Sequence, residues 1–293
     1  MSRRGDHLYN LWKDANNPRG LWRRTTLDEF RKSKSSWDVL LDVDRLAAIE
    51  AEDWLVSSTA VLPGSSHVLL ALSRGGSDAV TLREFDMITK SLCLMGLCCR
   101  KRAALVDQDT LLLSSAYGEG MATLSGYARI VRLWRRGDPI ERAAVVVFEI
   151  APDHIGVSCR IDRTGQEKRV WFIDQLDFFN SHTWLGTESG ANIKLDLPAD
   201  IWLQAHQDWL PVKLRSATAI AGVIYPADTL IGISLTAFLA GKRNFPVLLV
   251  ARPRRVLPGL FWSRGKLVLS ILDELRPVFE ISTPFATTWT ASR

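Results

Sequence analysis

The sequence predicts an all-β fold, more specifically a β-propeller built from four-stranded blades with few short helices. Apolar residues mostly alternate with polar ones or form short runs, which is the pattern of strands rather than of long helices. Turn residues separate these runs, and the group of strands recurs about every 45 to 50 residues. Radial repetition at such a period is how a propeller protects the edges of its sheets. A β-sandwich is the alternative, but its strands would not group into fours.

The first complete unit of the predicted repeat lies between residues 54 and 99. Residues 54–58, 68–73, 80–86 and 92–99 are its expected strands. Proline, glycine and serine at 63–65 form a turn after the first strand. Residues 80–86 alternate polar and apolar side chains, as a half-buried strand does.

Four further units follow at a similar spacing. Their expected strands are 111–115, 127–134 and 143–150 in the second unit, 155–161, 169–174, 178–185 and 193–197 in the third, and 259–262 and 266–272 in the fifth, which begins at 256; the fourth spans roughly 199–252. Turns are expected at 107–110, 135–139, 163–166 and 186–190. Helical spacing is confined to 40–52 and 235–242. We therefore expect a single β-propeller domain over residues 1–293 with about five or six blades.

The composition is that of a soluble globular protein: of 293 residues, 47% are hydrophobic and 24% charged. No apolar run approaches the roughly 18 residues of a membrane span, and no apolar segment follows the charged N-terminus, so we expect neither a membrane partner nor a signal peptide. Cys93, Cys98, Cys99 and Cys159 have neither zinc-ligand spacing nor a disulfide framework. We expect buried, reduced thiols and a cytoplasmic location.

The net charge of +5 raises the question of a nucleic-acid partner. The basic residues, however, occur in scattered pairs, most of them in or beside predicted turns, where solvated charge is the default. No strand combines basic and aromatic residues in the manner of an RNA-binding surface. We expect no nucleic-acid partner.

The stretch around Ser77 resembles the sharp turn that presents a nucleophilic serine in α/β-hydrolases. That turn needs a helix after the serine, and the alternating residues 80–86 predict a strand instead. We therefore expect a hairpin loop in which Gly75 or Gly76 supplies a positive φ and Asp78 bonds the local backbone.

No other part of the sequence forms a convincing catalytic constellation. The five histidines, which are His7, His67, His154, His182 and His206, lie far apart, and none belongs to a metal-binding helix motif. Phosphate-binding and dinucleotide-binding signatures are missing. We expect no catalytic, cofactor-binding or metal-binding residues and no cofactor. The eleven tryptophans are expected to pack between neighbouring blades rather than to line a binding face.

Four segments together resemble the propeller of bacterial members of the prolyl oligopeptidase family. Residues 9–25 contain Asn-Leu-Trp-Lys-Asp followed by Arg-Gly-Leu-Trp-Arg-Arg-Thr, and residues 37–44 read Trp-Asp-Val-Leu-Leu-Asp-Val-Asp. Residues 72–86 run from Ser-Arg-Gly-Gly-Ser-Asp to Arg-Glu-Phe-Asp, and residues 125–137 begin Ser-Gly-Tyr-Ala-Arg-Ile-Val. The resemblance covers most of the chain and fades after about residue 275.

This resemblance implies a seven-bladed propeller that caps an α/β-hydrolase domain with a Ser-Asp-His triad. In that family the propeller admits short peptides and excludes folded proteins. No triad residue has a counterpart here, so we expect a truncated, gating portion of a serine peptidase that is inactive alone. Its expected partners are short peptides, the missing hydrolase domain in cis or in trans, and further copies of itself if the propeller is unclosed. The alternative is a stand-alone propeller that binds proteins or peptides.

Overall fold

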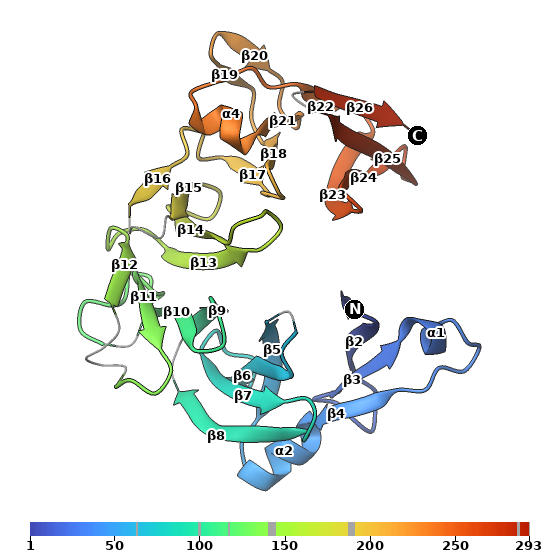
Figure 1. Ribbon diagram of the computed structural model, residues 1–293, viewed down its shortest axis with the longest axis vertical. Helices are drawn as coiled ribbons and strands as arrows, with labels where there is room; N and C mark the ends of the chain where they lie inside the picture. The colour runs from blue at the N-terminus through green and yellow to red at the C-terminus, as the bar shows by residue number, and fades with distance from the viewer. Residues whose placement is uncertain are drawn as a thin grey trace. The chain divides into compact units, whose positions relative to one another are not determined.

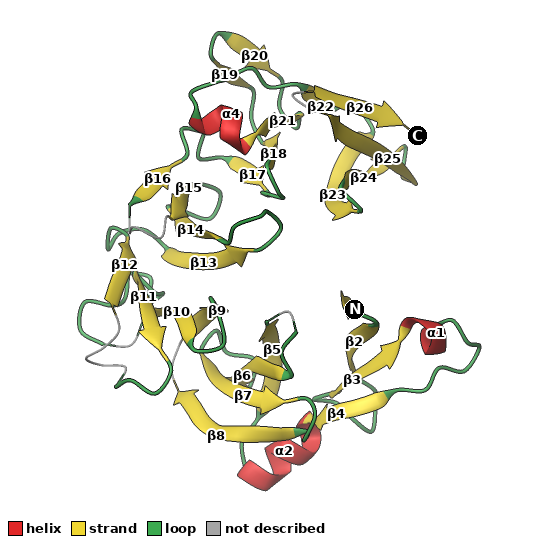
Figure 2. Ribbon diagram, viewed as in Figure 1, coloured by secondary structure: helices red, strands yellow, loops and turns green. Residues whose placement is uncertain are grey.

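The computed structural model describes residues 1–62, 64–98, 101–116, 118–139, 145–186, 191–285 and 288–292. It confirms the all-β prediction, because strands make up most of the described chain and its helices are three short ones (Figure 2). The chain divides into two compact units, Met1–Cys159 and Arg160–Arg293. Each unit is built from four-stranded antiparallel sheets, the blades of a β-propeller fold.

The N-terminal unit contains three of these sheets, which follow one another along the chain (Figure 1). Sheet 1 consists of β1 (Ser2–Arg4), β2 (His7–Trp12), β3 (Leu21–Thr26) and β4 (Asp38–Asp42). Sheet 2 consists of β5 (Trp54–Val61), β6 (His67–Arg74), β7 (Val80–Asp86) and β8 (Ser91–Cys98). Sheet 3 consists of β9 (Lys101–Leu105), β10 (Thr110–Ser115), β11 (Ile130–Arg135) and β12 (Val145–Glu149).

The remaining sheets belong to the C-terminal unit, apart from the first residues of β13. Sheet 4 consists of β13 (Gly156–Asp162), β14 (Arg169–Gln175), β15 (Ser181–Gly186) and β16 (Asn192–Lys194). Sheet 5 consists of β17 (Ile201–Leu203), β18 (Trp209–Leu214), β21 (Leu230–Ser234) and β22 (Val247–Leu249). Sheet 6 consists of β23 (Arg255–Ser263), β24 (Lys266–Asp273), β25 (Arg276–Phe285) and β26 (Thr288–Ser292). A small hairpin of β19 (Thr218–Ile220) and β20 (Val223–Tyr225) interrupts sheet 5 between β18 and β21.

The helices are short and lie between strands. They are α1 (Leu27–Phe30), α2 (Val43–Glu50) and α4 (Leu235–Leu239). Asp42 caps α2 by accepting a hydrogen bond from the Arg45 amide, and Ser234 caps α4 through the Ala237 amide. The helix predicted at 40–52 is therefore shorter in the structure, where α2 begins at Val43 because Leu40 is buried in β4. None of the helices in the described ranges has the length and apolar character that crossing a bilayer requires.

The core lies between neighbouring sheets, where large apolar side chains interlock. Between sheets 1 and 2 the Trp22 and Phe85 rings meet edge to face, with centroids 5.6 Å apart. Trp134 packs in the cluster between sheets 2 and 3, and Trp171 in the cluster between sheets 4 and 5. These tryptophans confirm the expected packing role. Trp12 departs from it, because its side chain is exposed at the end of β2.

Most strands confirm their predicted ranges to within a few residues, and the differences have local causes. β15 begins at Ser181 instead of 178, because the Asp177 carboxylate accepts the Phe179 and Asn180 amides and holds a turn there. β11 begins at Ile130 instead of 127, because residues 122–128 fold back on themselves. No strand was predicted at β1–β4, β9, β25 or β26, and the fourth unit, which contains β17–β22, was predicted without individual strand ranges. Residues 63, 99, 143, 144 and 187–190 of predicted turns and strands lie outside the described residues.

The six described sheets agree with the expected five or six blades. The strand pattern anticipated units only from residue 54 onward. Sheet 1 adds one unit before them, and its central strands β2 and β3 carry the first of the resemblance motifs.

Candidate functional site

Ser77 lies in the loop between β6 and β7, and the structure confirms that this loop is a hairpin. Gly75 and Gly76 both have positive φ, at +58° and +79°. The Ser77 amide donates to the Arg74 carbonyl at 3.0 Å, and its hydroxyl donates to the Ala79 carbonyl at 3.2 Å. β7 follows directly, so the residues after the serine are extended rather than helical. The described contacts of Ser77 are therefore those of a loop residue and do not activate its oxygen.

Asp78 makes a contact that the sequence did not predict. Its carboxylate accepts a hydrogen bond at 3.1 Å from the Tyr127 hydroxyl, which comes from the long loop of sheet 3. We had expected Asp78 to bond the neighbouring backbone. The bond instead joins the loops of sheets 2 and 3, and Tyr127 belongs to the fourth resemblance motif.

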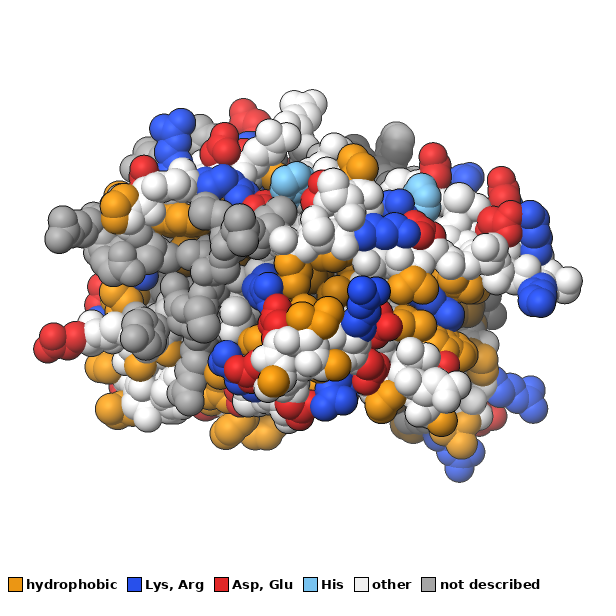
Figure 3. Space-filling view, turned by 90° about the horizontal axis from the view of Figure 1, so that it is seen from below, with side chains coloured by type: hydrophobic (Ala, Val, Ile, Leu, Met, Phe, Trp, Pro, Cys, Tyr) orange, Lys and Arg blue, Asp and Glu red, His pale blue; other side chains and the backbone are white. Residues whose placement is uncertain are grey.

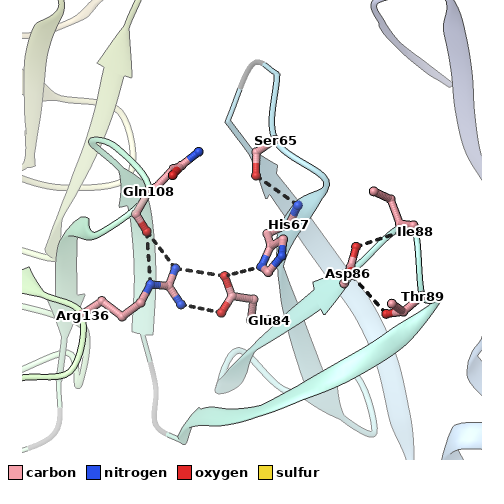
Figure 4. Close-up of polar contacts among 8 residues, drawn as sticks. All are labelled: Ser65, His67, Glu84, Asp86, Ile88, Thr89, Gln108 and Arg136. Atoms are coloured by element: carbon pink, nitrogen blue, oxygen red, sulfur yellow. Dashed lines mark hydrogen bonds and ion pairs between the residues drawn. The ribbon is translucent and has the colours of Figure 1, made fainter.

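A buried carboxylate lies at the other end of these two sheets (Figure 4). Glu84 of β7 has a side chain only 8% exposed, and both of its oxygens accept hydrogen bonds from Arg136, which follows β11. The Nδ1 atom of His67, in β6, lies 3.3 Å from the same carboxylate. Arg136 is held from its other side by the Gln108 carbonyl, at 3.1 Å from Nε.

This arrangement is built to join two sheets rather than to transfer protons. A carboxylate paired bidentately with a guanidinium has its charge compensated and its lone pairs occupied. Glu84 and Arg136 lie 52 residues apart, about one unit of the repeat. Sequence reasoning missed the pair, because neither residue belongs to a local motif.

Most of the histidines are not gathered into a catalytic group. His182 lies in β15, 3.9 Å from Asp174, whereas His206 stacks on the Trp262 ring in the C-terminal unit. Burial lowers the pKa of His206, against the opposing effect of the Asp162 carboxylate. The described residues contain no group of three His, Cys, Asp or Glu side chains that could hold a metal ion.

The cysteines likewise provide no nucleophile that the structure describes. Burial raises the pKa of the Cys159 thiol to about 12, so it stays protonated at neutral pH. Cys99 lies outside the described residues, and the structure does not describe the Cys93 and Cys98 side chains.

Charged side chains of both signs share the surface. On the coloured part of the face drawn in Figure 3, Lys and Arg are interspersed with Asp and Glu. Arg24 and Lys90, for example, both pair with Asp38. Such neutralised pairs do not create the continuous basic stripe that tracks a phosphate backbone.

The C-terminal unit instead exposes large apolar side chains on the loops between the second and third strands of its sheets. Phe178 and Phe179 of sheet 4 are 86% and 71% exposed, Ile224 of the inserted hairpin is 75% exposed, and Leu275 of sheet 6 is 89% exposed. Arg215 donates to the Phe179 carbonyl at 3.2 Å, which ties the loop of sheet 4 to that of sheet 5. We call these four residues the apolar loop surface.

The conformation of these loops is set locally. Hydrogen bonds from the Asn180 side chain and the Phe179 amide hold the pKa of Asp177 below its usual value, so a charged Asp177 fixes the turn that carries the two phenylalanines. Leu275 has a φ of +66° in a two-residue turn. The sequence analysis placed Phe178 and Phe179 in a strand; the flanking Asp177 and Asn180 were the available signal for a turn.

Large apolar side chains exposed on these loops are candidates for contact with another molecule. Singly exposed apolar residues are ordinary in soluble proteins. The exposure of two adjacent phenylalanines on a fixed turn is unusual.

Comparison with known proteins gives matches along most of the chain. Residues 1–175 match the family described as prolyl oligopeptidase, N-terminal beta-propeller domain. An uncharacterized peptidase of Sinorhizobium fredii is 28% identical over 289 residues, which is 91% of this chain and 38% of that protein. An uncharacterized peptidase of Rickettsia prowazekii is 25% identical over 93% of this chain and 40% of its own length.

A solved structure shares the fold over nearly the whole chain. The post-proline cleaving enzyme of Rickettsia typhi superposes with a TM-score of 0.88 at 24% identity, covering 98% of this chain and 45% of that one. The chain therefore spans less than half the length of each of these three proteins.

Proposed function

Because the chain belongs to the family of prolyl oligopeptidase N-terminal β-propeller domains, we propose that it is the substrate-gating propeller of a serine peptidase. In this proposal it admits short proline-containing peptides to a separate α/β-hydrolase domain, supplied in cis or in trans. It does not hydrolyse peptides alone. The Rickettsia typhi relative is a post-proline cleaving enzyme, which is the basis for the proline-containing substrate.

The observation that carries this proposal is the apolar loop surface. Phe178, Phe179 and Leu275 are more than 70% exposed, and covering them with a partner would remove apolar area from water. Fully burying one phenylalanine contributes on the order of 1.5–3 kcal/mol. A hydrolase domain seated on these loops would supply that cover.

Two further features support a role without catalysis of its own. Ser77 is engaged with the backbone of its own hairpin, through the Arg74 and Ala79 carbonyls. The buried Glu84 carboxylate is compensated by Arg136. Neither residue has the nucleophile–base geometry of a serine hydrolase.

The proposal also covers the cellular location of the chain and its other partners. We propose a cytoplasmic location, where a free thiol such as that of Cys159 stays reduced. No nucleic-acid partner is proposed, because acidic and basic side chains are interspersed on the face drawn in Figure 3. Self-association through the apolar loop surface is the expected behaviour of the chain when no hydrolase domain covers it, and light scattering would detect it.

The proposal is tested with a fluorogenic proline-containing peptide and two protein components. One is this chain, and the other is the part of the Sinorhizobium fredii peptidase outside the region aligned with it. We expect no turnover by the chain alone and measurable binding between the two components. Phe178→Ser and Phe179→Ser should each weaken that binding by at least about tenfold, since about 1.4 kcal/mol is a factor of ten.

Ile88→Ser is the matched control, because Ile88 is 76% exposed on a loop outside the apolar loop surface. It should leave binding unchanged. Turnover by the chain alone that disappears in Ser77→Ala would overturn the proposal in favour of a built-in hydrolase. Tight peptide binding without the second component would favour the stand-alone binding module.

A further inference from the structure

Sheet 5 meets sheet 4 on one side and sheet 6 on the other, and the two seams differ in chemistry. The seam between sheets 4 and 5 is tied by polar groups at both ends of the strands. The Gln207 amide donates to Thr164 Oγ1 at 2.6 Å, and the Gln207 carbonyl accepts from Arg169. At the opposite end Arg215 donates to the Phe179 carbonyl. Arg243, which follows α4, pairs with Asp196 at 3.3 Å.

The seam between sheets 5 and 6 is closed by apolar side chains: Leu230 and Leu249 pack with Leu257, Leu267 and Leu269 in a buried cluster, and an aromatic group packs beside it. The His206 ring stacks on Trp262 with centroids 4.4 Å apart, and Trp209 meets Trp289 edge to face at 4.9 Å. Trp262 and Trp289 are themselves 5.9 Å apart. We call these four residues the aromatic seam. Among the described residues, the hydrogen bond that crosses it runs from Lys213 Nζ to the Leu257 carbonyl at 3.3 Å.

Buried polar atoms on the sheet 6 side of this seam lack partners. Nε1 of Trp262 and of Trp289 is buried without a hydrogen-bond acceptor. A buried donor left unpaired bears the full cost of losing water. Opening the seam would restore water to these donors, and each restored bond favours the open form by roughly tenfold.

Apolar packing is non-directional, whereas a hydrogen bond weakens steeply as its angle departs from linearity. Both seams of the C-terminal unit enclose an apolar cluster. Side-chain hydrogen bonds at both ends tie sheets 4 and 5, whereas the described side-chain hydrogen bond between sheets 5 and 6 is the one from Lys213. The two seams are expected to open with different free energies.

We propose that sheets 5 and 6 separate transiently along the aromatic seam, whereas sheets 4 and 5 stay together. This opening is a built-in conformational device of the C-terminal unit. Its use as a lateral passage for short peptides rests on the proposed function, and the separation itself does not.

The indole N–H groups report the opening directly. In the full chain labelled with ¹⁵N-tryptophan, each indole signal is assigned by a Trp→Phe variant, and its exchange with D₂O is followed by NMR. We expect the Trp262 and Trp289 indoles to exchange at matching rates, at least about tenfold faster than Trp171. Trp171 is the reference because it is fully buried and its Nε1 lies 3.5 Å from Asp162 Oδ2.

A substitution that crowds the aromatic seam provides the second measurement. A Cβ at Gly232 would lie 3.0 Å from Leu248 Cδ1 and 3.2 Å from Cε2 of Trp289, so Gly232→Ala crowds the indole as well as Leu248. It should accelerate exchange at Trp262 and Trp289 and leave Trp171 unchanged. Gly186→Ala is the matched control: its Cβ would lie 2.7 Å from Phe172 within sheet 4, away from the aromatic seam.

The outcome separates this inference from the proposed function. The proposed opening is wrong if the Trp262 and Trp289 indole N–H groups exchange as slowly as that of Trp171, or at rates unrelated to each other. This measurement uses the wild-type chain, so it holds even if Gly232→Ala fails to fold. Indole exchange needs no peptidase activity, so a failed peptidase assay leaves this result unaffected.

Discussion

Replacing Glu84 by Gln should measure how strongly sheets 2 and 3 are held together. The Glu84 side chain is 8% exposed and Arg136 is 28% exposed. Glutamine keeps the shape but presents an amide group in place of one oxygen, so one charge-assisted bond is lost and the guanidinium is left uncompensated. Breaking a fully buried pair costs about 3–5 kcal/mol.

The expected cost here is smaller, because Arg136 keeps some contact with water and with the Gln108 carbonyl. Hydrogen bonds to charged groups contribute about 1.5–3 kcal/mol each. We therefore expect Glu84→Gln to lower the free energy of unfolding by about 2 kcal/mol. Urea unfolding followed by tryptophan fluorescence provides the measurement.

A double-mutant cycle with Arg136→Met isolates the pair from other effects of each substitution. The coupling free energy should be about 1.5–2 kcal/mol. Asp28→Asn is the control, since Asp28 pairs with Arg31 at 92% and 69% exposure, and it should change stability by less than about 0.5 kcal/mol. The reasoning fails if Glu84→Gln costs no more than this control, or if the coupling is near zero.

Two further predictions concern titratable groups outside that pair. Burial raises the pKa of Asp162, but hydrogen bonds from Thr164 and the charge of Arg169 outweigh this and hold it below its ordinary value. Its stabilisation is therefore present above the unfolded pKa of about 3.9 and is lost as the pH falls through the lower folded value. Urea midpoints of wild type and Asp162→Asn should converge in acid, and a gap independent of pH would contradict the assignment. Because burial raises the pKa of Cys159 to about 12, its alkylation by iodoacetamide near pH 8 should be at least about a hundredfold slower in the native chain than in urea. Peptide mass spectrometry measures this rate at Cys159, and equal rates in both states would show that the thiol is accessible.

Short-range pattern was sufficient for much of the fold. Residues 80–86 were predicted as a strand from their alternation, and β7 occupies that range. The same strand excluded Ser77 as the nucleophile of a hydrolase, because that turn requires a helix after the serine. Gly75 and Gly76 likewise predicted the hairpin loop, since glycine adopts positive φ without steric cost.

Weakly patterned or competing segments were predicted less well. β9 has two basic residues at its start, so periodicity did not reveal it. Phe178 and Phe179 were assigned to a strand on hydrophobicity, but the Asp177 carboxylate competes for their backbone and forms a turn. At residues 177–180 the hydrogen bonds of the Asp177 carboxylate therefore outweigh the strand propensity of the two phenylalanines.

What the sequence determined by itself is the class of fold, the period of the repeat and the family, because these depend on local alternation, turn residues and short motifs. Only the tertiary structure decided which residues meet. Glu84 and Arg136 pair across 52 residues, and His206 and Trp209 reach Trp262 and Trp289 in another sheet. No local pattern encodes such contacts, since they depend on how sheets pack. The candidate binding surface and the aromatic seam therefore became visible only once each unit was folded.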